Sequence, residues 1–140
     1  MMQPQMQPLM RIEKGVLAAM VAHVAAARPE EGCGLLGGRA GVVCRHYPIP
    51  NLARSPYRFV MAAQAQIDAL YAMADAGEEL LATYHSHPHG PAGLSASDRA
   101  ELPEGRIWHV VISWQSPDAP QVRVFGLEQM RVTEVTWRAV

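Results

Sequence analysis

Two histidines separated by a single residue, His85 and His87, follow a mostly apolar run at residues 80–84. The run predicts a β-strand, and alternate side chains of a strand project from the same face. The Cα atoms of the two histidines are then roughly 6.5 Å apart, from the rise per residue. Two imidazoles at that separation can converge on one ion through Zn–N bonds of about 2.0–2.1 Å. A fold that uses this pair must bring further ligands to the end of one strand.

A carboxylate that can complete such a site is Asp98, in the sequence S-A-S-D at residues 95–98. An irregular, glycine-containing loop at residues 89–94 allows it to fold back toward the histidines. Three protein ligands and one open position are typical of a catalytic zinc site. The same segment also fits a capping box, with Ser95 as N-cap of a short helix at residues 96–102. The two interpretations are compatible, because a cap fixes the direction of a carboxylate.

An H-x-H pair alone is weak evidence, because many such pairs are surface or core histidines. A third motif lies upstream, where Glu31 and Cys33 form E-x-C-G. E-x-C-G, H-x-H and S-x-x-D, with ten residues between His87 and Asp98, resemble in order and spacing the JAMM (MPN+) family of zinc metallopeptidases. An N-x-x-x-S-P-x-x-F stretch at residues 51–59 is similar to the bacterial members.

The resemblance covers residues 12–124 and shows one departure from the family pattern. The family usually has proline immediately before the motif serine, and this chain has Leu94 there. A proline at that position mainly stiffens the loop. We therefore expect a looser approach to Asp98 rather than loss of the site.

The resemblance implies that His85, His87 and Asp98 bind one zinc ion per chain. Glu31 would hold and deprotonate the zinc-bound water, and Ser95 would donate a hydrogen bond to the tetrahedral oxyanion. The physical basis is general: zinc lowers the pKa of bound water to roughly 7 and polarises the scissile carbonyl. A glutamate within hydrogen-bond reach can take that proton and pass it to the leaving amine.

The residues around Glu31 leave alternatives open. Taken alone, Glu31 is more simply a solvated acid after a helix, and its neighbour Glu30 faces the opposite way on a strand. The E-x-C-G register selects Glu31. Cys33 shares its face and is expected near the zinc, although a small buried hydrophobe is the default for both thiols. Cys44 is expected to face Leu35 across a hairpin.

Composition narrows the class of protein. The 140 residues carry a net charge of −1, and 49% are hydrophobic. This predicts one domain over residues 10–140, after a flexible tail at residues 1–9. No stretch reaches the roughly 20 apolar residues of a membrane span. The sequence has no run of Lys or Arg, which argues against nucleic acid as the main partner.

The expected location is cytoplasmic, since two cysteines are too few for a disulfide framework. A signal peptide at residues 16–27 is the competing interpretation, because this apolar stretch ends in three alanines. Glu13 in the basic flank and His23 within the apolar stretch argue against it. The apolar residues there also follow the stripe of an amphipathic helix.

The periodicities predict an α/β fold, a mixed, curved β-sheet packed with helices, which matches the cytidine-deaminase-like layering of the family. The expected helices cover residues 12–27 and 62–76, the second with Ile67, Leu70, Tyr71 and Met73 facing inward. The other expected strands cover residues 33–36 and 42–47 (a hairpin turning through 38–41), 57–61, 109–113, 122–127 and 132–137.

The resemblance implies an isopeptidase-like zinc metallopeptidase that hydrolyses an amide bond at the Gly-Gly C-terminal tail of a ubiquitin-like or sulfur-carrier protein. Such a tail can be held by strand augmentation beside an exposed strand. Two alternatives stay open: a non-catalytic MPN-type binding scaffold, and a cell-wall or phage-tail type of peptidase on the same fold. A zinc nucleobase deaminase is excluded by the missing P-C-x-x-C ligands. The natural substrate, the leaving group and a homodimeric state are not decided by the sequence.

Overall fold

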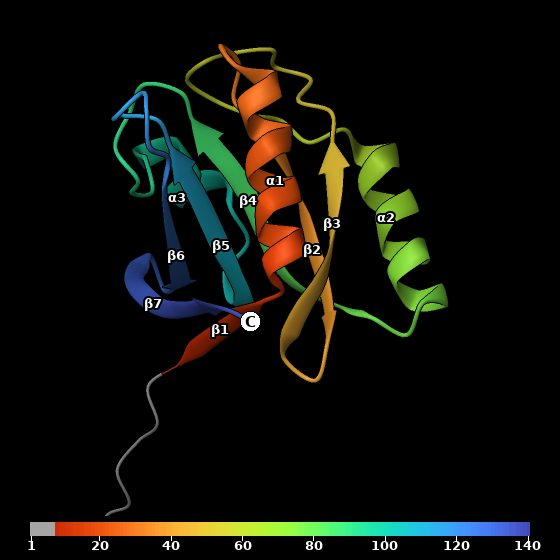
Figure 1. Cartoon of the computed structure of the whole chain (residues 1–140). Coiled ribbons are helices and arrows are strands. Elements are labelled where there is room, and N and C mark those ends of the chain that lie inside the picture. Colours follow the sequence, from red (N-terminus) through yellow and green to blue (C-terminus); the bar gives the residue numbers. More distant parts are fainter. Residues whose placement is uncertain (1–7) are drawn as a thin grey trace, which may run out of the picture.

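Seven strands of the computed structural model, which describes residues 8–140, close into a barrel in the order β1-β3-β2-β4-β5-β6-β7 (Figure 1). The expected mixed, curved sheet packed with helices is confirmed, and the sheet curves far enough to close. The elements are β1 (Leu9–Ile12), α1 (Lys14–Ala27), β2 (Cys33–Arg39), β3 (Val42–Ile49), α2 (Ala63–Asp75), β4 (Glu79–His87), α3 (Ala96–Glu101), β5 (Gly105–Ser113), β6 (Gln121–Glu128) and β7 (Arg131–Ala139).

Strand β1 closes the barrel by pairing in parallel with both β3 and β7. Residue 12 was expected to begin a helix, but it ends this strand, and α1 begins at Lys14. Met10 and Ile12 are buried inside the barrel, and a four-residue strand is too short to show a period. Of the expected tail, residues 1–7 lie outside the described residues and Leu9 begins β1.

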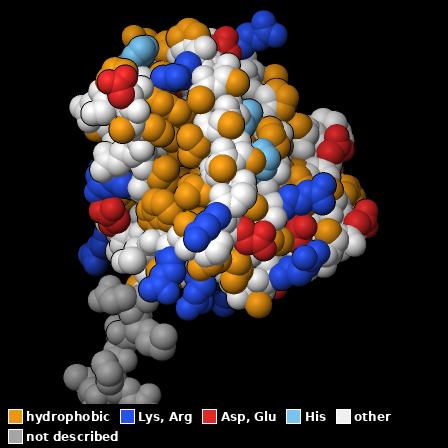
Figure 2. All heavy atoms as spheres, in the orientation of Figure 1, with side chains coloured by type: hydrophobic (Ala, Val, Ile, Leu, Met, Phe, Trp, Pro, Cys, Tyr) orange, Lys and Arg blue, Asp and Glu red, His pale blue; other side chains and the backbone are white. Residues whose placement is uncertain are grey.

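Helix α1 packs into the main hydrophobic core, which residues of all seven strands share. Its buried residues Val16, Met20 and Val24 recur every four positions. That spacing places them on one face of a helix. Figure 2 shows further hydrophobic side chains gathered beside α1, over β5. Neither α1 nor the other helices of residues 8–140 has the length and apolarity needed to cross a bilayer.

The hairpin of β2 and β3 is longer than expected and turns through Ala40 and Gly41. Both residues have positive φ, 51° and 77°, as a type I′ turn requires. The register shifts between Gly37 and Gly38, so Leu35 faces Tyr47. The expectation that Cys44 faces Leu35 is therefore wrong. The strands pair as far as Arg39 and Val42, closer to the turn than expected, and a bulge shifts the register by one further residue.

Helix α2 packs on this hairpin with a face that the periodicity did not indicate. Ala69 and Met73 are buried, whereas Ile67, Leu70 and Tyr71 are 45%, 44% and 69% exposed. The prediction that these three face inward is wrong, whereas the prediction that Met73 faces inward is confirmed. Small alanines allow the helix to approach the sheet closely, and the large apolar side chains are left on the outer face.

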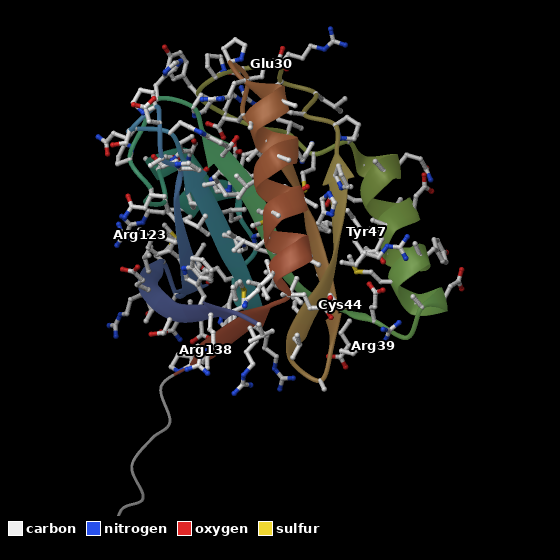
Figure 3. All side chains as sticks on the ribbon, in the orientation of Figure 1. Glu30, Arg39, Cys44, Tyr47, Arg123 and Arg138 are labelled. Atoms are coloured by element: carbon white, nitrogen blue, oxygen red, sulfur yellow. The ribbon has the colours of Figure 1, made fainter. Side chains whose placement is uncertain are left out.

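The C-terminal end of α2 is tied to the hairpin by polar contacts. The hydroxyl of Tyr47 donates to Glu78 Oε1 at 2.7 Å, and the guanidinium of Arg39 donates to the carbonyl of Ala76. Figure 3 shows Tyr47 and Arg39 on the side of the hairpin nearest α2. These contacts fix the helix beside β2 and hence beside the strand that carries the histidines.

The segment before α2 is a loop rather than the expected strand at residues 57–61. Its only ladder contact in the described chain is an isolated bridge between Asn51 and Met61. Hydrogen bonds from Ala62 N to Pro50 O and from Leu52 N to Val60 O close the base of this loop. Side-chain hydrogen bonding, rather than strand pairing, organises its interior.

Tyr84, in the middle of β4, depends on a glycine of the neighbouring strand. Tyr84 is fully buried, and its hydroxyl lies 2.8 Å from Nδ1 of His23 on α1. Gly34 pairs with Tyr84, and a Cβ at Gly34 would lie 2.4 Å from the ring. The close approach of this ring to the β2 backbone requires glycine.

We expect Gly34→Ala to lower the free energy of unfolding by about 1–3 kcal/mol, because the added methyl overpacks a buried ring. Urea denaturation measures this. Gly15→Ala is the control: nothing lies within 4 Å of a Cβ there, and alanine should stabilise α1 by about 0.5–1 kcal/mol. An unchanged urea midpoint for Gly34→Ala would contradict the packing described.

Candidate metal centre

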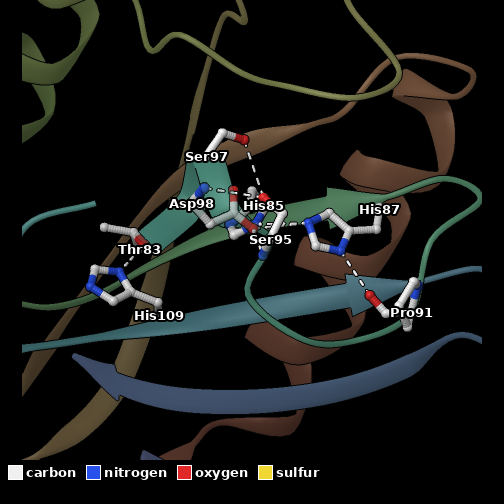
Figure 4. Close-up of polar contacts among 8 residues, drawn as sticks. All are labelled: Thr83, His85, His87, Pro91, Ser95, Ser97, Asp98 and His109. Atoms are coloured by element: carbon white, nitrogen blue, oxygen red, sulfur yellow. Dashed lines mark hydrogen bonds and ion pairs between the residues drawn. The ribbon is translucent and has the colours of Figure 1, made fainter. Parts of the chain in front are cut away.

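Strand β4 carries both histidines of the H-x-H motif at its C-terminal end (Figure 4). It lies between β2 and β5, with Cys33 opposite His85 on one side and Val111 on the other. Both imidazoles project from one face, as predicted, and their Nε2 atoms are 3.2 Å apart. His85 is fully buried and His87 nearly so. The strand pairing on both sides fixes the backbone from which the two rings project.

Asp98 reaches the same point from the first turn of α3. Its Oδ2 atom lies 3.0 Å from His85 Nε2 and 3.1 Å from His87 Nε2. Ser95 and Asp98 form the predicted capping box: Ser95 N donates to Asp98 Oδ2 at 2.9 Å, and Asp98 N donates to Ser95 Oγ at 3.1 Å. The approach of Asp98 is therefore tight despite Leu94, because the cap itself holds the carboxylate.

The tautomer of His87 follows from its second contact. Its Nδ1 lies 2.8 Å from the carbonyl oxygen of Pro91, which can only accept, so Nδ1 carries the proton. In the neutral ring Nε2 is then an acceptor, and it faces the carboxylate of Asp98. Two acceptors in contact need a proton or a cation between them. The donor set therefore suits a cation.

The spacing of the three atoms also suits zinc. The distances among His85 Nε2, His87 Nε2 and Asp98 Oδ2 are 3.0, 3.1 and 3.2 Å. Tetrahedral zinc with bonds of about 2.0–2.1 Å separates its ligand atoms by about 3.3–3.4 Å. A shift of a few tenths of an ångström would open this triangle to zinc geometry.

Glu31 lies in the irregular segment between α1 and β2 and is only 3% exposed. Ligand atoms of Glu31, His85 and His87 all lie within 4.8 Å of one another. Within the described chain, Glu31 Oε1 has no hydrogen-bond partner. A buried carboxylate oxygen without a hydrogen-bond partner is costly. Its position beside the imidazoles therefore indicates that Glu31 contacts a bound molecule or ion at this site. Glu30 lies beyond the end of α1, at the top of Figure 3.

Burial and mutual charge set the protonation of this cluster. Burial raises the pKa of Glu31 to about 8; the charge of Asp98 adds to this effect and His87 opposes it. Burial also lowers the pKa of His85. For Asp98, burial acts to raise the pKa, but hydrogen bonds from His85 and His87 outweigh it and hold the pKa well below its usual range. An ionised Asp98 and a neutral His85 are the forms that bind metals.

Cys33 and the remaining histidines lie outside this cluster. The thiol of Cys33 donates to the carbonyl of Ile49 at 3.3 Å, and burial, followed by the charge of Glu31, raises its pKa to about 12. It is a buried thiol rather than a thiolate ligand. His89 is exposed. His109 is a structural residue that accepts from Thr83 and donates to the carbonyl of Pro103.

Three residues at the site had no role in the sequence interpretation. The ring of Phe59 stacks on His85, with centroids 4.6 Å apart. Ser86 Oγ accepts from Gly32 N at 2.8 Å, and Asn51 Nδ2 donates to the carbonyl of Glu31 at 3.0 Å. Asn51 and Phe59 belong to the N-x-x-x-S-P-x-x-F stretch, which identified them as family-like without indicating their contacts.

A cavity of about 240 Å³ opens the site to the surface. Glu31, His87 and Ser95 line its polar side, and Tyr57, Gly93 and Leu94 are among its other walls. The arrangement places one buried base, a cation-binding triangle and a hydroxyl around one opening. Such a set can activate a water and stabilise an oxyanion in an acyl-transfer reaction.

Comparison with known proteins decides the family. The family described as prokaryotic homologs of the JAB domain matches residues 13–128. The chain belongs to this JAB/JAMM family. It is a peptidase of the JAMM type, and the expected resemblance is confirmed.

Alignments with individual relatives cover much of the sequence of this JAMM peptidase. The CysO-cysteine peptidase of Mycobacterium tuberculosis is 33% identical over 125 residues, 88% of this chain and 86% of the relative. A probable TtuB-protein conjugate cleaving protease of Thermus thermophilus is 42% identical over 91 residues, 64% of this chain and 61% of the relative. A solution structure from Desulfitobacterium hafniense has a TM-score of 0.85 at 33% identity, covering 94% of this chain and 92% of that one.

We expect the wild-type peptidase to bind one equivalent of zinc. His87→Ala and Asp98→Asn should each weaken binding by about 100-fold or more, since loss of supporting contacts alone costs 10–100-fold. Competition with a chromophoric chelator measures the affinity. His89→Ala removes an exposed imidazole two positions away and should bind like the wild type. Equal zinc affinity in His87→Ala would exclude the proposed ligand set.

Proposed function

We propose that this protein is a zinc metallopeptidase that hydrolyses the amide bond after the Gly-Gly tail of a ubiquitin-like or sulfur-carrier protein. The observation that carries the proposal is the unpartnered buried oxygen of Glu31 beside the converging atoms of His85, His87 and Asp98. The relatives named for CysO-cysteine and TtuB-conjugate cleavage support the substrate class.

His85, His87 and Asp98 would hold the zinc, as their acceptor atoms and spacing allow. When bound there, zinc would acidify a water and polarise the scissile carbonyl. In the neutral ring of His87, the hydrogen bond from Nδ1 to Pro91 O leaves the metal-facing Nε2 as the unprotonated nitrogen. The Ser95 amide, which donates to Asp98 Oδ2, keeps that carboxylate aimed at the same point.

Glu31 would serve as general base and then as general acid. It takes a proton from the attacking water and delivers it to the leaving amine, so it must both bind and release a proton. Burial raises the pKa of Glu31 to about 8, far above that of a solvated glutamate. This raised proton affinity suits the transfer to an amine.

Ser95 would stabilise the oxyanion. Its Oγ accepts from Asp98 N, so the hydroxyl proton is available to another acceptor, with Ser97 Oγ at 3.2 Å as the nearby competitor. Ser95 also lines the cavity that contains Glu31 and His87. A hydroxyl placed where negative charge develops lowers the barrier by a few kcal/mol.

The substrate tail would lie between loops and not along a free strand edge. Strand β4 pairs with β2 on one side and with β5 on the other, so the strand augmentation expected from the sequence has no edge beside the histidines. The cavity instead runs between Pro56 and Tyr57 on one side and residues 90–95 on the other. A glycine pair has no side chains to clash with these walls.

The body of the carrier protein would dock on the apolar face beside this cavity. A second cavity, of about 430 Å³, extends from Asp98 past Phe59 and Val60 to Leu70 on α2. Leu70, Ile67 and Tyr71 form an exposed apolar surface on that helix. Apolar surface next to a peptidase site favours a folded protein substrate over a free peptide.

Location in the cytoplasm is part of the proposal. Cys33 and Cys44 are both free thiols. Free cysteines are typical of proteins in reducing compartments.

We expect the zinc-loaded enzyme to release the amine from a Gly-Gly conjugate and to stop when a chelator is added. Glu31→Gln should lower kcat by about 10²–10⁴-fold, because the general base is lost, while zinc still binds. Mass spectrometry of the products and metal analysis measure the two effects. Turnover that persists in chelator, or a preference for cell-wall peptides over the Gly-Gly conjugate, would contradict the proposal.

We expect Leu70→Glu to raise KM for the protein conjugate about tenfold, as loss of 1.4 kcal/mol of binding implies, with kcat unchanged. The charge is placed in the apolar surface but away from the reacting atoms. Gln64→Glu adds the same charge on α2 at a residue that does not line the second cavity, and should leave KM unchanged. Equal KM values in all three proteins would exclude this face as the docking site.

A further inference from the structure

Glu31 is held by no helix or strand of its own. It lies between α1 and β2, and its backbone groups bond to the loop at residues 50–62. Its amide donates to the carbonyl of Ser55 at 2.9 Å, and its carbonyl accepts from Asn51 Nδ2 at 3.0 Å. The position of the proposed base therefore depends on how that loop is organised.

Asn51, the only asparagine of the chain, organises the loop from within. Its Nδ2 donates to Arg58 O at 3.1 Å as well as to Glu31 O. Its Oδ1 accepts from Ala53 N at 3.0 Å and from Val60 N at 2.9 Å. An amide side chain offers two donors and two acceptor positions, and Asn51 uses all four. No other residue type of this size offers that set.

The loop also carries a ring that covers a metal-binding residue. Phe59, which lies between Arg58 and Val60, stacks on His85 at an interplanar angle of 29°. Ser55 supplies the carbonyl for the Glu31 amide, and its Oγ accepts from Tyr57 N. Asn51, Ser55 and Phe59 of the N-x-x-x-S-P-x-x-F stretch thus each contact Glu31, His85 or the loop around them.

The opposite side of Glu31 is fixed by β4. Gly32 N donates to Ser86 Oγ at 2.8 Å, and Ser86 N donates to Gly32 O at 3.0 Å. Ser86 lies between the two histidines, so Gly32 is tied to the strand that carries them. Glu31 is therefore held between this strand contact and Asn51. The strand contact includes a backbone-to-backbone bond, whereas the Asn51 contact depends entirely on one side chain.

We propose that Asn51 is the positioning residue that aligns the general base Glu31 with the metal site. The inference rests on the proposed function and goes beyond it, since Asn51 touches neither substrate nor metal ligand. It acts through the two donors on Nδ2. The two acceptor bonds of Oδ1 hold the loop together and serve a separate, structural purpose.

The two halves of the amide can be separated by substitution. Asn51→Asp keeps the shape and both acceptor bonds but removes the donors to Glu31 and Arg58, whereas Asn51→Ala removes all four bonds. Ser55→Ala is the matched control in the same loop. It removes only the hydroxyl that accepts from Tyr57 N and keeps the carbonyl that Glu31 uses.

The experiment is a double-mutant cycle with Glu31→Gln on zinc-loaded protein and a Gly-Gly conjugate. We expect Asn51→Ala and Asn51→Asp to lower kcat by about 10–100-fold, as loss of supporting contacts does, with KM and one bound zinc retained. In the Glu31→Gln background they should change kcat by less than about twofold, because the base on which they act is gone. Ser55→Ala should match the wild type in kcat.

A second measurement does not depend on catalysis. Amide hydrogen exchange at Glu31 should become about tenfold faster in both Asn51 variants, because the segment loses its anchor. Unchanged protection at Glu31 would overturn the inference, as would equal loss of kcat in both backgrounds or loss of zinc. Wild-type turnover in Glu31→Gln would instead refute the proposed function, and the exchange data would still decide whether Asn51 holds Glu31.

Discussion

The site depends on three lone-pair-bearing atoms being held together in a buried place. His85 Nε2, His87 Nε2 and Asp98 Oδ2 lie 3.0–3.2 Å apart, where only a proton or a cation can relieve their repulsion. Burial strengthens both the repulsion and the attraction for a cation. The rest of the fold can be understood as the means of keeping these atoms in place: strand pairing for the histidines, a helix cap for the aspartate.

Several residues serve the structure and the chemistry with one side chain. Asp98 completes the capping box of α3 and faces both imidazoles with the same oxygen. His87 fixes the loop after β4 through Pro91 and thereby fixes its own tautomer. A site assembled this way would need little reorganisation on binding a cation, which is the condition for electrostatic catalysis.

Much of the fold and site could be predicted from local patterns, and the failures have physical causes. The strand through His85 and His87 and the capping box at Ser95 are short-range features and are confirmed. The apolar stripe of Ile67, Leu70 and Tyr71 had a clear helical period, but α2 packs through its alanines. Helical period shows where apolar side chains lie, whereas packing decides which face can approach a sheet.

The sequence by itself determined the residue types and spacing of the candidate metal site, the α/β class and the family, because each resides in residue identity or in a period of two to four residues. Only the tertiary structure decided that the sheet closes, that no strand edge is free beside the histidines, and that Asn51 holds Glu31. Glu31 and Asn51 are 20 residues apart and meet in irregular backbone. Contacts of that kind follow no local period, so they exist only once the chain is folded.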